Sequence, residues 1–191
     1  MRTRTRKLLF STAFAAGVLV ASAPEVLAAD WVIKQPSAHP TYRAELEPHG
    51  NLILYRYRNY GRASRRYFGD AEGGAGFRAS IELADPAFIK KINNTIAISF
   101  GLDLTNCRYC RHDEFSIWSP VAMQWNFFLT RKWSVFGEVG AIVRSDGFYR
   151  DLWLDPALWV GGRYHFNDKI ALTMRAGVPW LSIGVSFFVG S

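Results

Sequence analysis

Apolar and small or polar residues alternate along most of the chain after residue 50, most clearly between residues 75 and 83. Every second residue there is apolar, and the residues between them are small or charged, in the run AGFRASIEL. Successive side chains of a β-strand point to opposite faces, so a period of two indicates a strand with one apolar face. The chain is therefore predicted to be all-β.

Eight segments show this pattern and are predicted to be strands: 51–58, 75–84, 94–105, 115–129, 133–144, 152–166, 169–178 and 181–189. Most reach the roughly 9–11 residues that a tilted strand needs to cross a bilayer. The connections alternate between long ones, such as 106–114, and tight ones, such as 130–132. This alternation is typical of membrane barrels, whose outer loops are long and whose inner turns are short. We expect an antiparallel eight-stranded transmembrane up-and-down β-barrel over 51–191, preceded by a periplasmic lead-in at 29–50.

Residues 1–28 have the features of a secretory signal peptide. Four cations lie among the first seven residues, an apolar stretch follows to Ala23, and Val26-Leu27-Ala28 is a small-residue cleavage site. Removal of this leader takes away four cations and one anion, which lowers the net charge from +7 to +4. No stretch after the leader approaches the roughly 18 consecutive apolar residues of a membrane-spanning helix.

The residue types on the two faces distinguish a membrane barrel from a soluble ligand-carrying barrel, which also alternates but turns its apolar face inward. The second face of the predicted strands is rich in Gly, Ala and Ser, with few charges, and so differs from a solvent-exposed face dense in Lys and Glu. Small residues fit the narrow interior of an eight-stranded barrel. The pattern favours a barrel in the bacterial outer membrane and leaves the soluble periplasmic barrel as an alternative.

The C-terminal segment 182–189 has the pattern of a terminal assembly signal: a polar residue, a glycine, and two apolar or aromatic residues two positions apart. Ser182, Gly184, Phe187 and Val189 fill these places. With this signal and the alternating strands, the chain resembles small eight-stranded outer-membrane proteins of the OmpA/OmpX type. The resemblance implies insertion by the outer-membrane assembly machinery. The chain departs from the family pattern in one respect, because family members usually end on the aromatic residue, whereas Gly190 and Ser191 follow the last apolar residue here.

Several charged residues fall at the alternate strand positions that are predicted to point into the barrel. They are Arg56, Arg58, Arg78, Glu82, Asp103, Glu138, Arg163 and Arg175. Buried charges need partners, so we expect these residues to pair across strands in a lumen charge network. A structural network that fills the lumen is favoured over a gated pore or a proton path, because the interior of such a barrel is only wide enough for side chains.

Cys107 and Cys110 form a CxxC pair in a predicted outer loop. A disulfide, a redox centre and half of a zinc site are the alternatives. Export through an oxidising compartment favours the disulfide. A redox centre of the thioredoxin type needs a helix N-terminus, and zinc would need ligands from His112, Asp113 or Glu114. No cofactor is expected.

The predicted outer loops are rich in arginine and aromatic residues. The arginines are Arg62, Arg65, Arg66, Arg108, Arg111, Arg144 and Arg150. Guanidinium groups pair bidentately with phosphate, so these loops are candidates for contact with lipopolysaccharide, although a plain solvated surface has the same composition. Binding of nucleic acid is not expected in this location.

The function expected from the sequence is non-catalytic: envelope structure, surface attachment or contact with lipopolysaccharide. The enzymatic alternative is an acyl hydrolase or acyltransferase that acts on lipid A. Such chemistry needs a serine next to a histidine near the outer leaflet. Only His112 is predicted on that side, and Ser116 lies about 13 Å further along the strand, out of hydrogen-bonding reach.

Overall fold

The barrel is built from eight long antiparallel strands. The computed structural model describes residues 30–53, 56–60, 63–67, 72–106, 115–146 and 152–190, and for 56–60, 63–67 and 146 only the backbone. The barrel strands are β1 (Ala44–Ile53), β4 (Glu72–Ala84), β5 (Asn94–Asn106), β6 (Phe115–Phe128), β7 (Trp133–Asp146), β8 (Leu152–Asn167), β9 (Ile170–Val178) and β10 (Trp180–Val189). In the described part of the chain, no helix is long and apolar enough to span a membrane.

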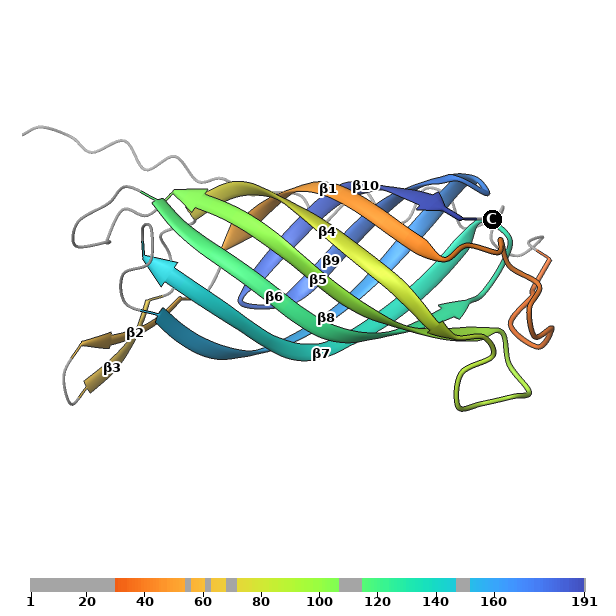
Figure 1. The fold of residues 1–191 in the computed structure, drawn as a ribbon, viewed down its shortest axis with the longest axis horizontal. Helices are drawn as coiled ribbons and strands as arrows, with labels where there is room; N and C mark the ends of the chain where they lie inside the picture. Colours follow the sequence, from red (N-terminus) through yellow and green to blue (C-terminus); the bar gives the residue numbers. More distant parts are fainter. Residues whose placement is uncertain are drawn as a thin grey trace, which may run out of the picture.

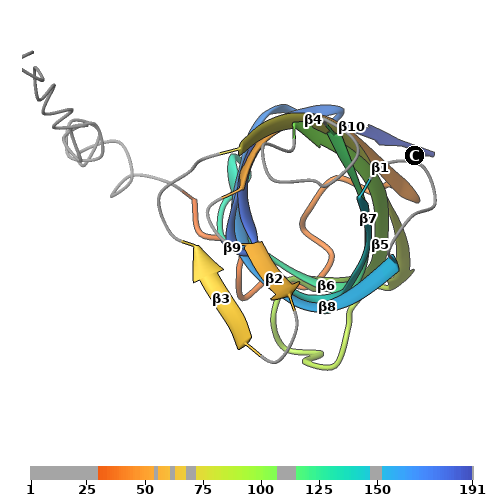
Figure 2. The ribbon, with the colours of Figure 1, turned by 90° about the vertical axis from the view of Figure 1, so that its left-hand side faces the viewer.

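Each strand pairs with its neighbour along the chain, and β1 closes the barrel between β10 and β4 (Figures 1 and 2). The strands β2 (Arg56–Tyr60) and β3 (Ala63–Tyr67) form a separate two-stranded sheet. This hairpin extends beyond the barrel at the end opposite the C-terminus (Figure 1). The predicted eight-stranded antiparallel barrel is confirmed.

The first barrel strand begins earlier than predicted. It covers Ala44–Ile53, so residues 44–50 of the expected lead-in belong to the barrel, and the predicted strand at 51–58 is wrong. Residues 44–53 alternate with the same period of two, but the inward residues include Glu45, Glu47 and His49 and an outward one is Pro48. The register with β10 contains residues 44–46 and 49–53 and leaves out Glu47 and Pro48, of which Pro48 has no N–H to donate to a ladder.

Apolar side chains cover the outside of the barrel. Leu154 and Val139, for example, are 72% and 63% exposed. The residues between them point inward and are mostly polar, and Ser99, Gln124, Thr173 and others on the inner face are at most 1% exposed. This distribution is the reverse of a soluble barrel, in which the apolar face is turned inward.

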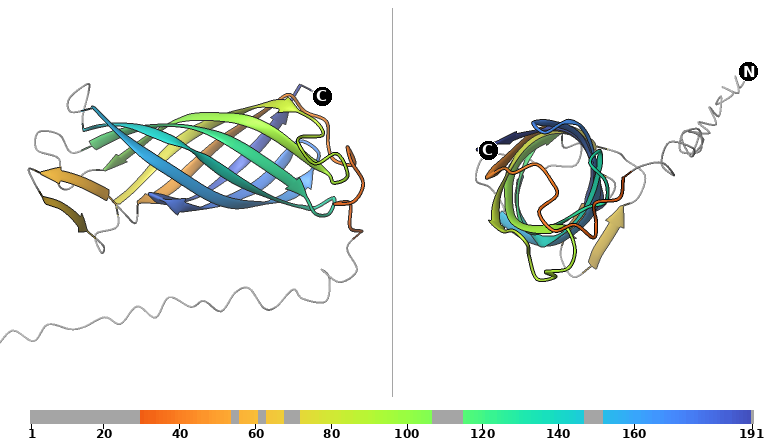
Figure 3. Two further views of the ribbon diagram at one scale, coloured as in Figure 1. Left: turned by 90° about the horizontal axis from the view of Figure 1, so that it is seen from below. Right: turned by 90° about the vertical axis from the view of Figure 1, so that its right-hand side faces the viewer.

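The two ends of the barrel differ. At the end that carries the C-terminus, tight turns join β6 to β7 and β8 to β9, and we call it the short-turn end. The other end, where β2 and β3 lie, is the long-loop end. Residues 30–43 cross the opening at the short-turn end, as the right-hand view of Figure 3 shows. The N–H of Val32 donates to the carbonyl of Leu129, and the N–H of Asn93 donates to the carbonyl of Ile33.

Candidate functional site: the charged lumen

Three arginines and three glutamates form the centre of the lumen. Arg163 of β8 binds Glu45 of β1 bidentately, with Nε to Oε1 at 2.8 Å and Nη2 to Oε2 at 2.7 Å. The third guanidinium nitrogen donates to Asn126 Oδ1 at 3.0 Å, and the Ser186 hydroxyl donates to Glu45 Oε1 at 2.6 Å. All of these side chains are buried, so the lost hydration is replaced by charge-assisted hydrogen bonds.

Closer to the long-loop end, Arg175 of β9 contacts two carboxylates. Its Nη1 and Nη2 lie 2.8 and 2.9 Å from the two oxygens of Glu47, and its Nε lies 3.0 Å from Glu138 Oε2. Arg78 of β4 donates to the same Glu138 oxygen at 2.7 Å. Glu138 is therefore shared by two arginines, and the six groups Glu45, Glu47, Glu138, Arg78, Arg163 and Arg175 balance in formal charge.

Asp103 of β5 belongs to a neighbouring cluster. Its Oδ1 lies 2.7 Å from His49 Nε2 and accepts a hydrogen bond from Asn51 Nδ2 at 2.6 Å. The other ring nitrogen of His49 lies 3.2 Å from the backbone carbonyl oxygen of Glu47. Both His49 and Asn51 come from β1, so this strand supplies polar partners at four alternate positions, 45, 47, 49 and 51.

Aromatic rings pack against the buried arginines of the lumen. The Phe136 ring contacts two guanidinium groups, with its centroid 4.1 Å from Arg163 Cζ and 5.0 Å from Arg175 Cζ. Towards the long-loop end, Arg78 Cζ lies 4.5 Å from the Trp159 ring, and Trp159 packs on Trp180 with centroids 5.3 Å apart. These cation–π contacts compensate part of the desolvation of the buried arginines.

A stack of rings closes the lumen at the short-turn end. His39 of the crossing segment lies on Phe128 with ring centroids 4.1 Å apart, and His165 stacks on Phe188 at 5.4 Å. Tyr42 packs against Phe188 at 4.7 Å, and its burial raises the pKa of its hydroxyl group above the ordinary value. Residues 30–43 thus contribute side chains to the closure as well as backbone contacts.

The same end contains a buried serine–histidine contact. Ser134 Oγ lies 2.9 Å from His165 Nε2, whereas His165 Nδ1 has no hydrogen-bond partner among the residues that the structure describes. A serine nucleophile needs a base that is itself held in position by a third group. Ser134 is fully buried, so its hydroxyl group is not accessible to a lipid substrate in this structure. We interpret the contact as part of the lumen packing.

The side chains of the lumen bind one another and so stabilise the barrel. The central carboxylates and guanidiniums come from β1, β4, β7, β8 and β9, and each is at most 2% exposed. Breaking any one pair would leave a buried charge without its partner, which is much more costly than removing both. The lumen side chains therefore hold strands on opposite sides of the barrel together.

The structure brings most of the predicted lumen charges into contact with one another or with residues of β1. Arg78, Glu138 and Arg175 meet directly, Arg163 pairs with Glu45, and Asp103 pairs with His49. Glu82 is different. It lies at the end of β4 beside an irregularity in the β4–β5 register, is half-buried, and has no ion pair among the described residues. Arg56 and Arg58 belong to β2, outside the barrel wall.

Sequence reasoning missed Glu45, Glu47 and His49 as lumen residues because it placed them in the lead-in. The alternation of residues 44–52 was the signal that could have found them. Arg144 was expected in an outer loop, but it is buried inside the long-loop end, 3.5 Å from Asp155 and over the Trp118 ring.

Other predicted residues are in places that the structure describes only partly. Arg65 and Arg66 lie in β3, whereas Arg62, Arg108, Arg111, Arg150, Cys107 and Cys110 lie outside the described residues. The residues of the predicted assembly signal are in β10, where Ser182 and Gly184 face inward and Phe187 and Val189 face outward. A β-carbon at Gly184 would come within 2.6 Å of His49 Cβ, so the close packing of β10 on β1 needs glycine at this position.

Comparisons with known proteins support the fold. No family model matches the chain, and no curated protein matches it. A de novo designed transmembrane β-barrel is similar in structure, with a TM-score of 0.50 and 10% sequence identity over 78% of this chain and 99% of the design. The chain has the fold of a transmembrane β-barrel.

A second similar structure is the outer membrane protein Ail of Yersinia pestis, determined in a phospholipid bilayer nanodisc. It has a TM-score of 0.43 and 11% identity, over 74% of this chain and 97% of Ail. What is shown of the expected resemblance is the fold: a closed eight-stranded antiparallel barrel, similar in structure to the designed transmembrane barrel. Within the described residues of this transmembrane β-barrel, no group of three His, Cys, Asp or Glu side chains could hold a metal ion.

Proposed function

We propose that this protein is an integral outer-membrane barrel with a closed lumen and a non-catalytic role at the cell surface, in which its outer loops contact lipopolysaccharide. The observation that carries the proposal is the distribution of side chains: an apolar outer surface around a lumen filled by paired charges. An apolar exterior needs lipid around it, and a lumen occupied by ion pairs leaves little room for a ligand or an ion path.

The proposed orientation puts the short-turn end in the periplasm and the long-loop end outside the cell. Short periplasmic turns and long outer loops are the rule for bacterial outer-membrane barrels. The two arginines of β3 are then on the outer side, at the level where lipopolysaccharide phosphates lie. Arginine is the side chain best suited to bind phosphate bidentately.

Fractionation of cell envelopes tests the location, combined with gel electrophoresis of unboiled and boiled samples. We expect the protein in the outer-membrane fraction and a shift in mobility on boiling, because a closed barrel stays folded in detergent until it is heated. A soluble periplasmic protein without a shift would contradict the proposal and would favour the soluble barrel.

The loop contact has its own test. Replacing Arg65 and Arg66 together by alanine is expected to weaken binding of the refolded barrel to phosphorylated lipopolysaccharide by about tenfold or more, since two charge-assisted contacts are lost. Surface plasmon resonance on immobilised lipopolysaccharide would measure the affinity. Lys90→Ala with Lys91→Ala is the matched control, because it removes two cations at the opposite end. Equal affinity in all three proteins would make the β3 arginines ordinary surface charges.

A further inference from the structure

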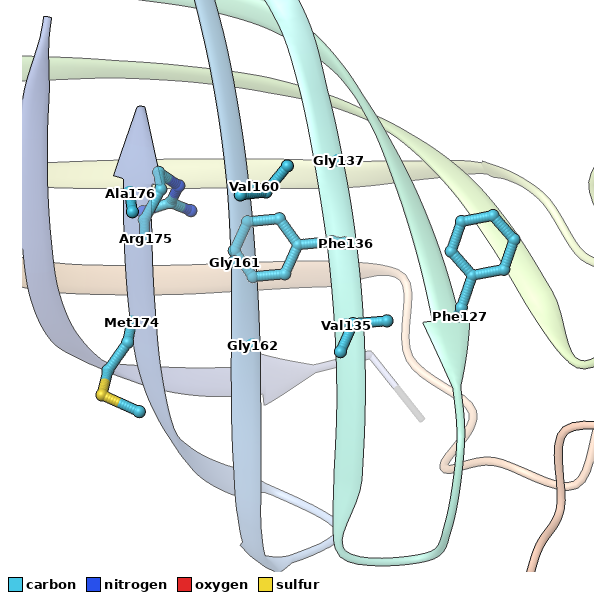
Figure 4. A pocket seen from close by; sticks show the side chains of 10 residues that line it. All are labelled: Phe127, Val135, Phe136, Gly137, Val160, Gly161, Gly162, Met174, Arg175 and Ala176. Atoms are coloured by element: carbon cyan, nitrogen blue, oxygen red, sulfur yellow. The ribbon is translucent and has the colours of Figure 1, made fainter. Parts of the chain in front are cut away.

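A groove of about 570 Å³ opens on the outer surface of the barrel, over β7, β8 and β9. Two outward glycines form its floor: Gly137 of β7, paired with Val160, and Gly162 of β8, paired with Val135 and Met174. Figure 4 shows these positions without side chains, among Val135, Val160 and Met174. The groove is therefore lined mainly by hydrocarbon groups, with Arg175 as the one charged lining residue, and it opens on the outer face of the barrel.

The fold itself does not require glycine at these two positions. A β-carbon at Gly137 would have no atom within 4 Å, and one at Gly162 would be at ordinary contact distance, 3.7 Å from the Ser134 carbonyl oxygen. Neither has a positive φ. By contrast, a β-carbon at Gly161 would overlap the Phe136 ring. At Gly137 and Gly162 the missing side chains thus create space instead of relieving strain.

Cations lie at the short-turn end of the same three strands. Lys132 is in the turn before β7 and Lys169 is in the turn between β8 and β9, and both are exposed. The N–H of His165 donates to the Lys132 carbonyl, which holds this turn beside β8. Arg131 adds a third cation and Asp168 a single anion in these two turns. The end of the barrel below the groove is therefore net positive.

Aromatic rings lie between the cations and the groove. Trp133 packs against Tyr164 across β7 and β8 with centroids 5.0 Å apart, and Tyr164 packs against Phe166 at 5.4 Å. Such rings prefer the membrane interface. Gly137 is five residues from Lys132, which is about 17 Å of strand. At the usual tilt this is about 13 Å along the membrane normal, half of the roughly 25 Å apolar band of these barrels.

We propose that this face binds one anionic phospholipid of the periplasmic leaflet, with an acyl chain in the groove and the phosphate at Lys132 and Lys169. The inference rests on the proposed insertion in the outer membrane. The order of groups along the strands, cations first, then interfacial rings, then an apolar groove, matches the order of phosphate, glycerol and hydrocarbon in a phospholipid. An apolar groove alone would bind any chain, and the lysines provide selection for an anionic headgroup.

The test uses native mass spectrometry of the barrel released from nanodiscs that contain equal amounts of phosphatidylglycerol and phosphatidylcholine. We expect wild-type protein to retain one phosphatidylglycerol molecule. Gly137→Leu with Gly162→Leu fills the groove and should reduce the retained lipid by about tenfold or more. Gly73→Leu is the matched control: Gly73 is also outward and exposed, and its β-carbon would lie 3.9 Å from the nearest atom.

The headgroup contact is tested separately with Lys132→Gln and Lys169→Gln. This variant should still retain a lipid but should lose the preference for phosphatidylglycerol, whereas Lys90→Gln with Lys91→Gln should keep it. Retention of phosphatidylglycerol by the groove-filled variant at the wild-type level would overturn the inference. A wild-type dimer that the filled groove abolishes would also overturn it, because the occupant would then be a second copy of the chain.

Gel electrophoresis of unboiled and boiled samples distinguishes a failure of the proposed lipid site from a failure of the proposed membrane barrel. If every variant and the wild type show the mobility shift but none retains phospholipid, the lipid site is wrong and the membrane barrel stands. If the wild type itself shows no shift, the proposed function fails together with the lipid site.

Discussion

Replacing Glu138 by leucine is expected to lower the free energy of unfolding of the barrel by about 3–5 kcal/mol, the cost of leaving a buried ion pair without one partner. Glu138 is 1% exposed and is shared by Arg78 and Arg175. Without it, Arg78 loses the carboxylate to which it donates, and Arg175 keeps only its bidentate contact with Glu47 among the ion pairs of the described residues. Urea titration of the refolded barrel in lipid vesicles, followed by the unboiled band on a gel, would measure the change.

Two further variants test whether the loss of stability comes from the missing carboxylate and not from the introduced leucine. Val139→Leu introduces the same side chain one position along, on the outward face, where Val139 is 63% exposed, and should leave stability nearly unchanged. Glu138→Leu combined with Arg78→Met removes one cation with the anion and should recover part of the loss. Planar-bilayer recordings should show no new current for any of these variants. A current through Glu138→Leu would instead favour a gated pore in which this carboxylate closes the path.

The second large effect is expected from valine at Gly161. The Phe136 ring lies directly over this glycine, and a β-carbon there would overlap the ring and come within 2.6 Å of the Met174 carbonyl oxygen. Displacement of Phe136 also disturbs Arg163 and Arg175, whose guanidinium groups pack on its ring. Overpacking together with weakened ion pairs should lower the free energy of unfolding by about 3 kcal/mol or more.

Gly137→Val is the control for this second prediction, because it adds the same side chain on the neighbouring strand, where no atom lies within 4 Å of the new β-carbon. Both variants would be refolded into detergent, and the folded fraction would be measured from the unboiled band. Equal folding of the two variants would show that the barrel accommodates a side chain at residue 161, and that the placement of Phe136 is not needed for the network.

The alternation of residue types predicted seven of the eight barrel strands to within a few residues. It failed for β1 because Glu45, Glu47, Pro48 and His49 look like an irregular polar segment when strands are expected to be mostly apolar. In a barrel with a polar lumen, the inward positions of a strand can all be charged or polar, and a proline can occupy a position at which one ladder is interrupted.

The sequence by itself determined the class of fold and the inward face of the charges on the correctly predicted strands, such as Arg78, Glu138 and Arg175, because a strand sends alternate side chains to opposite sides whatever its partners are. It could not determine which carboxylate meets which arginine. Glu45 and Arg163 are 118 residues apart, and Glu47 and Arg175 are 128 apart, and they meet only because β1 closes the barrel between β4 and β10. The groove was also decided by tertiary structure, since Gly137 and Gly162 form one hollow only through the register of β7 with β8.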